Sequence, residues 1–125
     1  MAASIKELKE NLAYSCNILA HEGHWDNILG HVSVRIPGQN KILMKPHSLG
    51  FEEIRPQHII VADIETGKKT DGKYERHSEV FIHTEIMKAR KDVNCVVHSH
   101  PPYATAFGAL GQKLRPISHE GSIFY

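Results

Sequence analysis

The first part of the chain carries apolar residues at the period of an α-helix. Five of them recur three or four positions apart: Ile5, Leu8, Leu12, Cys16 and Leu19. This spacing places them on one helix face. Ser4 with Glu7 three residues later is a capping-box signature, so we expect a helix that begins here and ends near Glu22-Gly23.

After a polar loop that ends at Gly30, the pattern changes to the two-residue alternation of half-buried β-strands. We expect strands at residues 31–36, 41–44 and 59–63, with a turn at 37–40. The polar stretch 68–77 is predicted to be a loop or an edge strand.

A second helix is predicted at residues 79–91, with Ser78 as its N-cap. Its apolar face is expected from Ile82, Ile86 and Ala89. Three basic residues lie near the C-terminus of this predicted helix, where the negative end of the helix dipole favours positive charge: Lys88, Arg90 and Lys91.

A short buried strand is expected at residues 95–98, because Pro101-Pro102 cannot continue a hydrogen-bonded ladder. A third helix is predicted at 103–110. Helices that alternate with short strands predict an α/β or α+β fold in which helices cover a mostly antiparallel sheet.

Composition narrows the class of protein. A chain of 125 residues forms one domain at most, and 15 basic against 14 acidic residues give no reason to expect nucleic acid or an anionic membrane as partner. Neither a membrane span nor a secretory signal is evident. We expect Cys16 and Cys95 to be buried thiols rather than a disulfide, and the protein to be cytoplasmic. Ten histidines point to a metal or acid–base site.

His98 and His100 are the first candidates for such a site. Residues i and i+2 of a strand point to the same side, so both imidazoles could reach one ion. The alternative is that both rings bond to backbone or water, and the pair alone does not decide between them. A catalytic zinc site also normally has three protein ligands and one open position.

Glu79, at the start of the second predicted helix, is the candidate general acid or base. A carboxylate beside a metal-bound carbonyl compound could move a proton. The alternative is an ordinary acidic residue that stabilises the helix N-terminus.

Two longer segments carry a family resemblance. The motif G-H-V-S-V-R is followed by S-E-V-F-I-H-T-E-I-M-K-A-R-K-D-V-N-C-V-V-H-S-H-P-P-Y-A-T-A-F-G. This order resembles the class II aldolase/adducin family from about residue 5 onward, most specifically over 78–108. The resemblance implies a three-layer α/β/α fold around a mostly antiparallel sheet, and a carbon–carbon lyase that works through a metal-stabilised enolate or enediolate.

The same resemblance assigns roles to individual residues. His98 and His100 match two metal-ligating histidines and Glu79 matches the acid/base glutamate, with zinc as the expected metal and manganese or cobalt as alternatives. The third ligand is expected beyond Tyr125, so the chain is expected to be a single domain that is incomplete at its C-terminus. His119 is expected to be a substrate-pocket residue or a substitute ligand.

The chain departs from the family where sugar-phosphate members hold the phosphate. The three matching loop positions read Gly30-His31, His47-Ser48 and His77-Ser78. Bulky, partly cationic imidazoles are expected to suit a planar carboxylate better than a phosphate, as in the branch that decarboxylates hydroxylated aromatic dicarboxylates. The alternative is that these histidines are surface residues.

Other functions remain open at this point. A sugar-phosphate aldolase or 4-epimerase would share the ligands, and an adducin-like interaction domain would keep the fold without chemistry. The resemblance also implies a small-molecule substrate and a homo-oligomer, commonly a tetramer, for the full-length protein.

Overall fold

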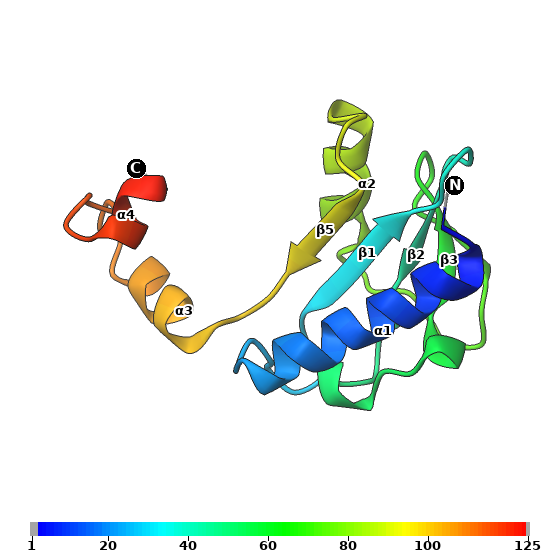
Figure 1. The fold of residues 1–125 in the computed structure, drawn as a ribbon, viewed down its shortest axis with the longest axis horizontal. Coiled ribbons are helices and arrows are strands. Elements are labelled where there is room, and N and C mark those ends of the chain that lie inside the picture. The colour runs from blue at the N-terminus through cyan, green and yellow to red at the C-terminus, as the bar shows by residue number, and fades with distance from the viewer. Residues whose placement is uncertain (1–2, 125) are drawn as a thin grey trace.

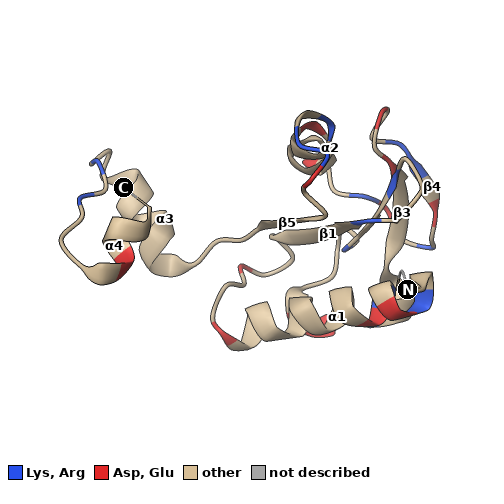
Figure 2. Ribbon diagram, turned by 45° about the horizontal axis from the view of Figure 1, so that its top comes forward, with Lys and Arg blue, Asp and Glu red and all other residues tan. Residues whose placement is uncertain are grey.

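The structure is a computed structural model that describes residues 3–124. Its main body has three layers (Figures 1 and 2): helix α1 (Ile5–His21) covers one face of a β-sheet and helix α2 (Val80–Ala89) covers the other. The expected α/β/α architecture is therefore confirmed. Within the described residues, no helix is long and apolar enough to cross a membrane.

The sheet contains five strands in the order β4-β3-β2-β1-β5, and every neighbouring pair is antiparallel. The strands are β1 (His31–Arg35), β2 (Lys41–Met44), β3 (Ile60–Asp63), β4 (Lys69–Asp71) and β5 (Cys95–His98). The predicted boundaries are correct to within one residue for β1, β2, β3 and β5. Part of the stretch at 68–77 forms the edge strand β4. Two 3₁₀ turns, η1 (Phe51–Glu53) and η2 (Pro56–His58), occupy the loop between β2 and β3.

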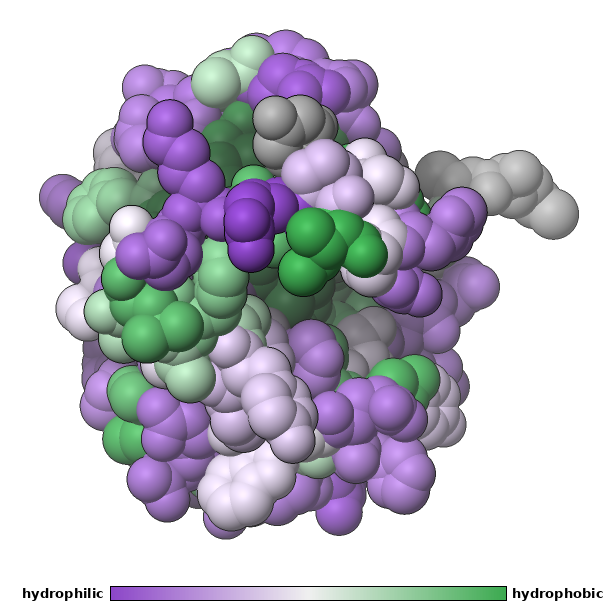
Figure 3. Space-filling model, turned by 90° about the vertical axis from the view of Figure 1, so that its left-hand side faces the viewer, coloured by the Kyte–Doolittle hydropathy of each residue, from purple (hydrophilic) through white to green (hydrophobic). Residues whose placement is uncertain are grey.

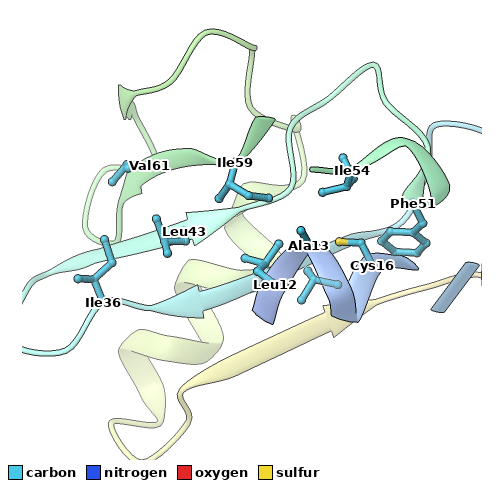
Figure 4. Close-up of a cluster of buried hydrophobic side chains, with 10 residues drawn as sticks. Leu12, Ala13, Cys16, Ile36, Leu43, Phe51, Ile54, Ile59 and Val61 are labelled. Atoms are coloured by element: carbon cyan, nitrogen blue, oxygen red, sulfur yellow. The ribbon is translucent and has the colours of Figure 1, made fainter. Parts of the chain in front are cut away.

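Helix α1 begins as expected, because the backbone N–H of Glu7 donates to the side chain of Ser4 over 3.2 Å. Its inner face packs on alternate residues of the strands and on η1 (Figure 4). This first core contains Leu12, Ala13, Cys16, Val32, Ile36, Leu43, Phe51, Ile54, Ile59 and Val61. Ile5 is exposed, since the first turn extends beyond this contact.

Helix α2 covers the opposite face with a different set of residues from the one predicted. Ile82 and Ile86 are exposed, and the buried positions are Val80, His83, Thr84 and Met87. The predicted apolar face was wrong because the buried set and the predicted set both follow helical spacing, so periodicity alone cannot choose between them. The buried set also includes the polar His83, whose partners on the sheet are not visible in the sequence pattern. The N-cap is Glu79 rather than Ser78, and the helix ends at Ala89.

Strand β5 lies at the edge of the sheet and is less buried than expected. Val96 faces α2 and is buried, whereas Val97 and Cys95 are exposed. These two side chains point to the face of the sheet that α1 covers elsewhere, but α1 does not extend over β5. Cys95 is thus not a buried thiol, although it and the buried Cys16 are both free, as predicted.

Beyond β5 the chain leads away from the layers to α3 (Pro102–Ala109) and α4 (His119–Ile123), which lie beside each other (Figure 1). Helix α3 begins one residue before the predicted range. Several apolar side chains of this segment are exposed, among them Tyr103, Leu110 and Ile117. Figure 3 views the molecule from this end and shows separate apolar patches among polar side chains.

Candidate metal and acid–base site

The histidine pair lies where β5 ends. His98 and His100 bring their Nε2 atoms to 3.0 Å from each other, with the two rings nearly perpendicular. The register between β1 and β5 pairs His31 with His98, and their rings stack with centroids 4.7 Å apart. The sheet therefore gathers a third histidine beside the expected pair.

A loop that follows α1 contacts this pair. Asp26 Oδ2 lies 3.1 Å from His100 Nδ1, and His24 Nδ1 lies 3.1 Å from Ser99 Oγ. Neither loop residue was singled out in the sequence. Both residues lie in the polar segment before Gly30, and the sequence pattern does not show that this segment contacts β5.

Glu79 stands at the N-terminus of α2 with its side chain about half exposed. His31 Nε2 lies 3.0 Å from its Oε2 atom. This hydrogen bond is the main reason that the pKa of the Glu79 carboxyl lies below its ordinary value. Glu79 is therefore ionised at neutral pH, with one oxygen held by His31.

A chain of hydrogen bonds continues from Glu79 into the protein. His31 Nδ1 lies 2.5 Å from His83 Nε2, and His83 Nδ1 lies 2.7 Å from Ser33 Oγ. An ionised carboxylate can only accept, so His31 carries its proton on Nε2. Burial lowers the pKa of both histidines, His83 to about 3, and keeps them neutral. His83 therefore donates to His31 Nδ1 and accepts from the Ser33 hydroxyl.

Lys45 and His77 form a second buried group beside His31. The Lys45 ammonium is fully buried, donates to the carbonyl of Ile28 over 2.9 Å and lies 3.4 Å from His77 Nε2. Burial lowers the pKa of Lys45 to about 8, and burial with the Lys45 charge lowers the pKa of His77 to about 3. His77 therefore accepts from Lys45 through Nε2 and is neutral.

The neutral state of His31 and His77 corrects one expectation. These imidazoles were expected to be partly cationic, but desolvation by burial disfavours their charged form. The positive charges near this cluster belong instead to Lys45 and to Arg76. The sequence pattern missed both residues.

The predicted substrate residues are only partly brought together. Gly30, His31 and His77 are buried in this region, and the His77 ring lies 4.6 Å from the His31 ring. His47 and Ser78 line a shallow hollow of about 400 Å³ with Glu75 and Arg76. Ser48 lies beside His47, and its hydroxyl is 2.7 Å from His47 Nδ1.

His119 is not part of this cluster. It is the first residue of α4, exposed and displaced from the layered body (Figure 1). A separate hollow of about 470 Å³ is lined by Asn17, Ala20, His21, Trp25 and Glu52. It lies against α1 rather than α2, and the hydrogen-bonded groups around Glu79 do not line it.

Two sets of side chains could hold a divalent metal. Ligand atoms of His31, His77 and Glu79 lie within 4.8 Å of one another. However, the Nε2 of His31 donates to Glu79 and that of His77 accepts from Lys45, so these nitrogen atoms are already engaged. In His98 and His100 the two Nε2 atoms converge on each other, and their separation suits two ligands of one cation.

Most of the chain matches a known protein family. The Class II Aldolase and Adducin N-terminal domain family matches residues 10–125. The chain belongs to this family. The match confirms the resemblance found in the motifs, and it begins within α1 and covers the sheet and the later helices.

Individual relatives of this class II aldolase/adducin chain are named as lyases. It is 36% identical over 116 residues to a 3,4-dihydroxyphthalate decarboxylase of Arthrobacter keyseri, covering 87% of this chain and 46% of that protein. It is 34% identical over 116 residues to an L-fuculose phosphate aldolase of Methanococcus maripaludis, covering 91% and 60%.

The solved structure of L-fuculose 1-phosphate aldolase from Glaciozyma antarctica PI12 matches with a TM-score of 0.87 at 30% identity. The match covers 100% of this chain and 54% of that one. The chain thus spans about half the length of the relatives it matches.

Proposed function

We propose that residues 1–125 form the metal-binding and acid–base part of a divalent-metal-dependent carbon–carbon lyase. The observation that carries this proposal is the convergence of the His98 and His100 Nε2 atoms over 3.0 Å beside the ionised Glu79. Class II aldolases use a divalent metal, and zinc is the metal that we expect here. The substrate is a small hydroxy-carbonyl or hydroxy-carboxylate compound.

Each group has a distinct part in this proposal. A bound divalent cation would supply Lewis-acid stabilisation of the negative charge that develops when the carbon–carbon bond breaks. Glu79 moves a proton to or from the substrate carbon. His31 holds one carboxylate oxygen of Glu79 over 3.0 Å, which leaves the other oxygen free for that transfer.

The surroundings of Glu79 favour a carboxylate-bearing substrate. His47, Ser78 and Arg76 line the hollow next to the histidine cluster. An arginine guanidinium binds a planar carboxylate with two parallel hydrogen bonds, and imidazole N–H groups add further donors. The relationship to 3,4-dihydroxyphthalate decarboxylase supports the same preference.

The metal is tested by measuring zinc in purified protein encoded by the complete reading frame that contains residues 1–125. We expect about one equivalent per chain in wild type, loss of zinc in His98→Ala and His100→Ala, and retention in the control His119→Ala. Absence of a stoichiometric divalent metal from wild type would overturn the proposal. Glu79→Gln should keep the metal but lose turnover.

The reaction is tested by comparing two substrates with the same zinc-loaded protein. Release of carbon dioxide from a dihydroxylated aromatic dicarboxylate is expected, with slower or no retro-aldol cleavage of a ketose 1-phosphate. Activity on the sugar phosphate alone would reverse the substrate preference and favour the aldolase. Epimerisation without cleavage would contradict the lyase proposal itself.

A further inference from the structure

Asp26 is placed to control how the ring of His100 is presented. We propose that Asp26 is a positioning residue that holds His100 with its proton on Nδ1 and its Nε2 lone pair directed toward His98. The ligand role of His100 rests on the proposed function, whereas the orientation of its ring rests on geometry alone.

The backbone of Asp26 belongs to a short hydrogen-bonded turn. The backbone N–H of Leu29 donates to the Asp26 carbonyl over 2.8 Å, and Asn27 between them has a left-handed φ of 49°. Asp26 and Leu29 also form an isolated bridge. The turn thereby fixes the position from which the Asp26 side chain reaches His100, 3.1 Å away.

The segment that carries His100 needs such support because it lies beyond the sheet. Strand β5 ends at His98, and Pro101 has no N–H with which to extend the ladder. Pro101 also restricts His100 to extended backbone. The loop after α1 contacts this segment at two points, through His24 to Ser99 and through Asp26 to His100.

The chemistry of the pair selects one tautomer of His100. A neutral imidazole has a single N–H, and an ionised carboxylate can only accept a hydrogen bond. The contact with Asp26 therefore places the proton on Nδ1. His100 Nε2 is left with a lone pair, 3.0 Å from His98 Nε2. A carboxylate that orients a histidine in this way also raises its basicity as a metal ligand.

The proposal is tested by titrating Zn²⁺ into metal-free protein against a fluorescent chelator of known affinity. Asp26→Ala is expected to weaken zinc binding roughly 10- to 100-fold. Asp26→Asn should fall between wild type and alanine, because its amide oxygen still accepts a hydrogen bond but carries no charge. Asp92→Asn is the matched control, since Asp92 is exposed and pairs with Arg90.

A second measurement requires no metal. Nitrogen-15 NMR of the imidazole rings should show His100 as the Nδ1–H tautomer in wild type and in Asp92→Asn, and a mixture of tautomers in Asp26→Ala. Thermal unfolding of each variant, followed by circular dichroism, checks that the fold persists.

The two measurements separate this inference from the proposed function. If wild type binds zinc and Asp26→Ala binds it equally well with the same His100 tautomer, the positioning role is overturned while the metal site stands. If wild type binds no divalent metal but Asp26→Ala alters the His100 tautomer, the positioning role stands and the proposed function fails.

Discussion

Gly30 joins the loop after α1 to β1 at a point where the chain is crowded. Its φ is +75°, and a Cβ atom there would lie 2.7 Å from the Phe51 ring and 3.4 Å from the carbonyl oxygen of His98. Gly30 therefore lies between Phe51 of the first core and the His98 backbone of the histidine cluster, and a side chain at this position would contact both. Gly30 was predicted as a substrate-binding residue, and the fold also requires a glycine here because of the positive φ and the contact with Phe51.

We expect Gly30→Ala to lower the free energy of unfolding by about 2–4 kcal/mol, from backbone strain together with overpacking against Phe51. Gly38→Ala is the matched control, because Gly38 has nearly the same φ, +73°, with nothing within 4 Å of the added Cβ. That control should lose only about 1 kcal/mol. Equal losses in urea unfolding would show that the contact with Phe51 is unimportant.

At the scale of the elements, Arg35 connects β1 to the C-terminal end of α2. Its guanidinium donates to the carbonyl of Met87 over 2.8 Å, and to those of Val93 and Arg90. The cations predicted to suit the dipole at this end are Lys88, Arg90 and Lys91. In the structure Lys88 pairs with Glu85 and Arg90 with Asp92. A strand residue therefore satisfies the helix carbonyls.

We expect Arg35→Lys to lower the free energy of unfolding by about 1–3 kcal/mol, because an ammonium cannot reproduce the planar fork of donors. Arg90→Lys is the control, since its ion pair is exposed and such pairs contribute about 0–1 kcal/mol. Urea unfolding at pH 7 measures both. If the two substitutions cost the same, Arg35 does not link the strand to the helix in the way described.

At the scale of the whole molecule, buried neutral histidines couple folding to pH. The pKa values of His77 and His83 fall from 6.5 to about 3 in the folded protein. Unfolded chains therefore bind more protons between pH 6.5 and 3, so stability is fully present above pH 6.5 and is lost as pH falls toward 3.

We expect the free energy of unfolding to fall between pH 7 and pH 5, by about 1–2 kcal/mol for each of these groups. His77→Gln should flatten this dependence while keeping an acceptor for Lys45, and the exposed His119→Gln should leave it unchanged. The measurement is urea unfolding at each pH in the presence of a chelator. A dependence that is the same in both variants would contradict a neutral, buried His77.

Most of the local elements and the main chemical groups can be predicted from the amino-acid sequence. Helical and two-residue periods predicted α1 and the strands, because these patterns reflect contacts between near neighbours in sequence. The histidine pair and Glu79 were identified because their motifs are continuous in the chain.

Contacts between distant residues could not be predicted, because they arise from the packing of separate elements. The register of β1 against β5 brought His31 to His98, and the packing of α2 on the sheet brought His83 to Ser33 and turned Ile82 outward. The loop after α1 brought Asp26 to His100. These contacts span 50 residues or more between Ser33 and His83 and between Asp26 and His100. No periodicity within one segment encodes them, because they depend on how separate segments pack.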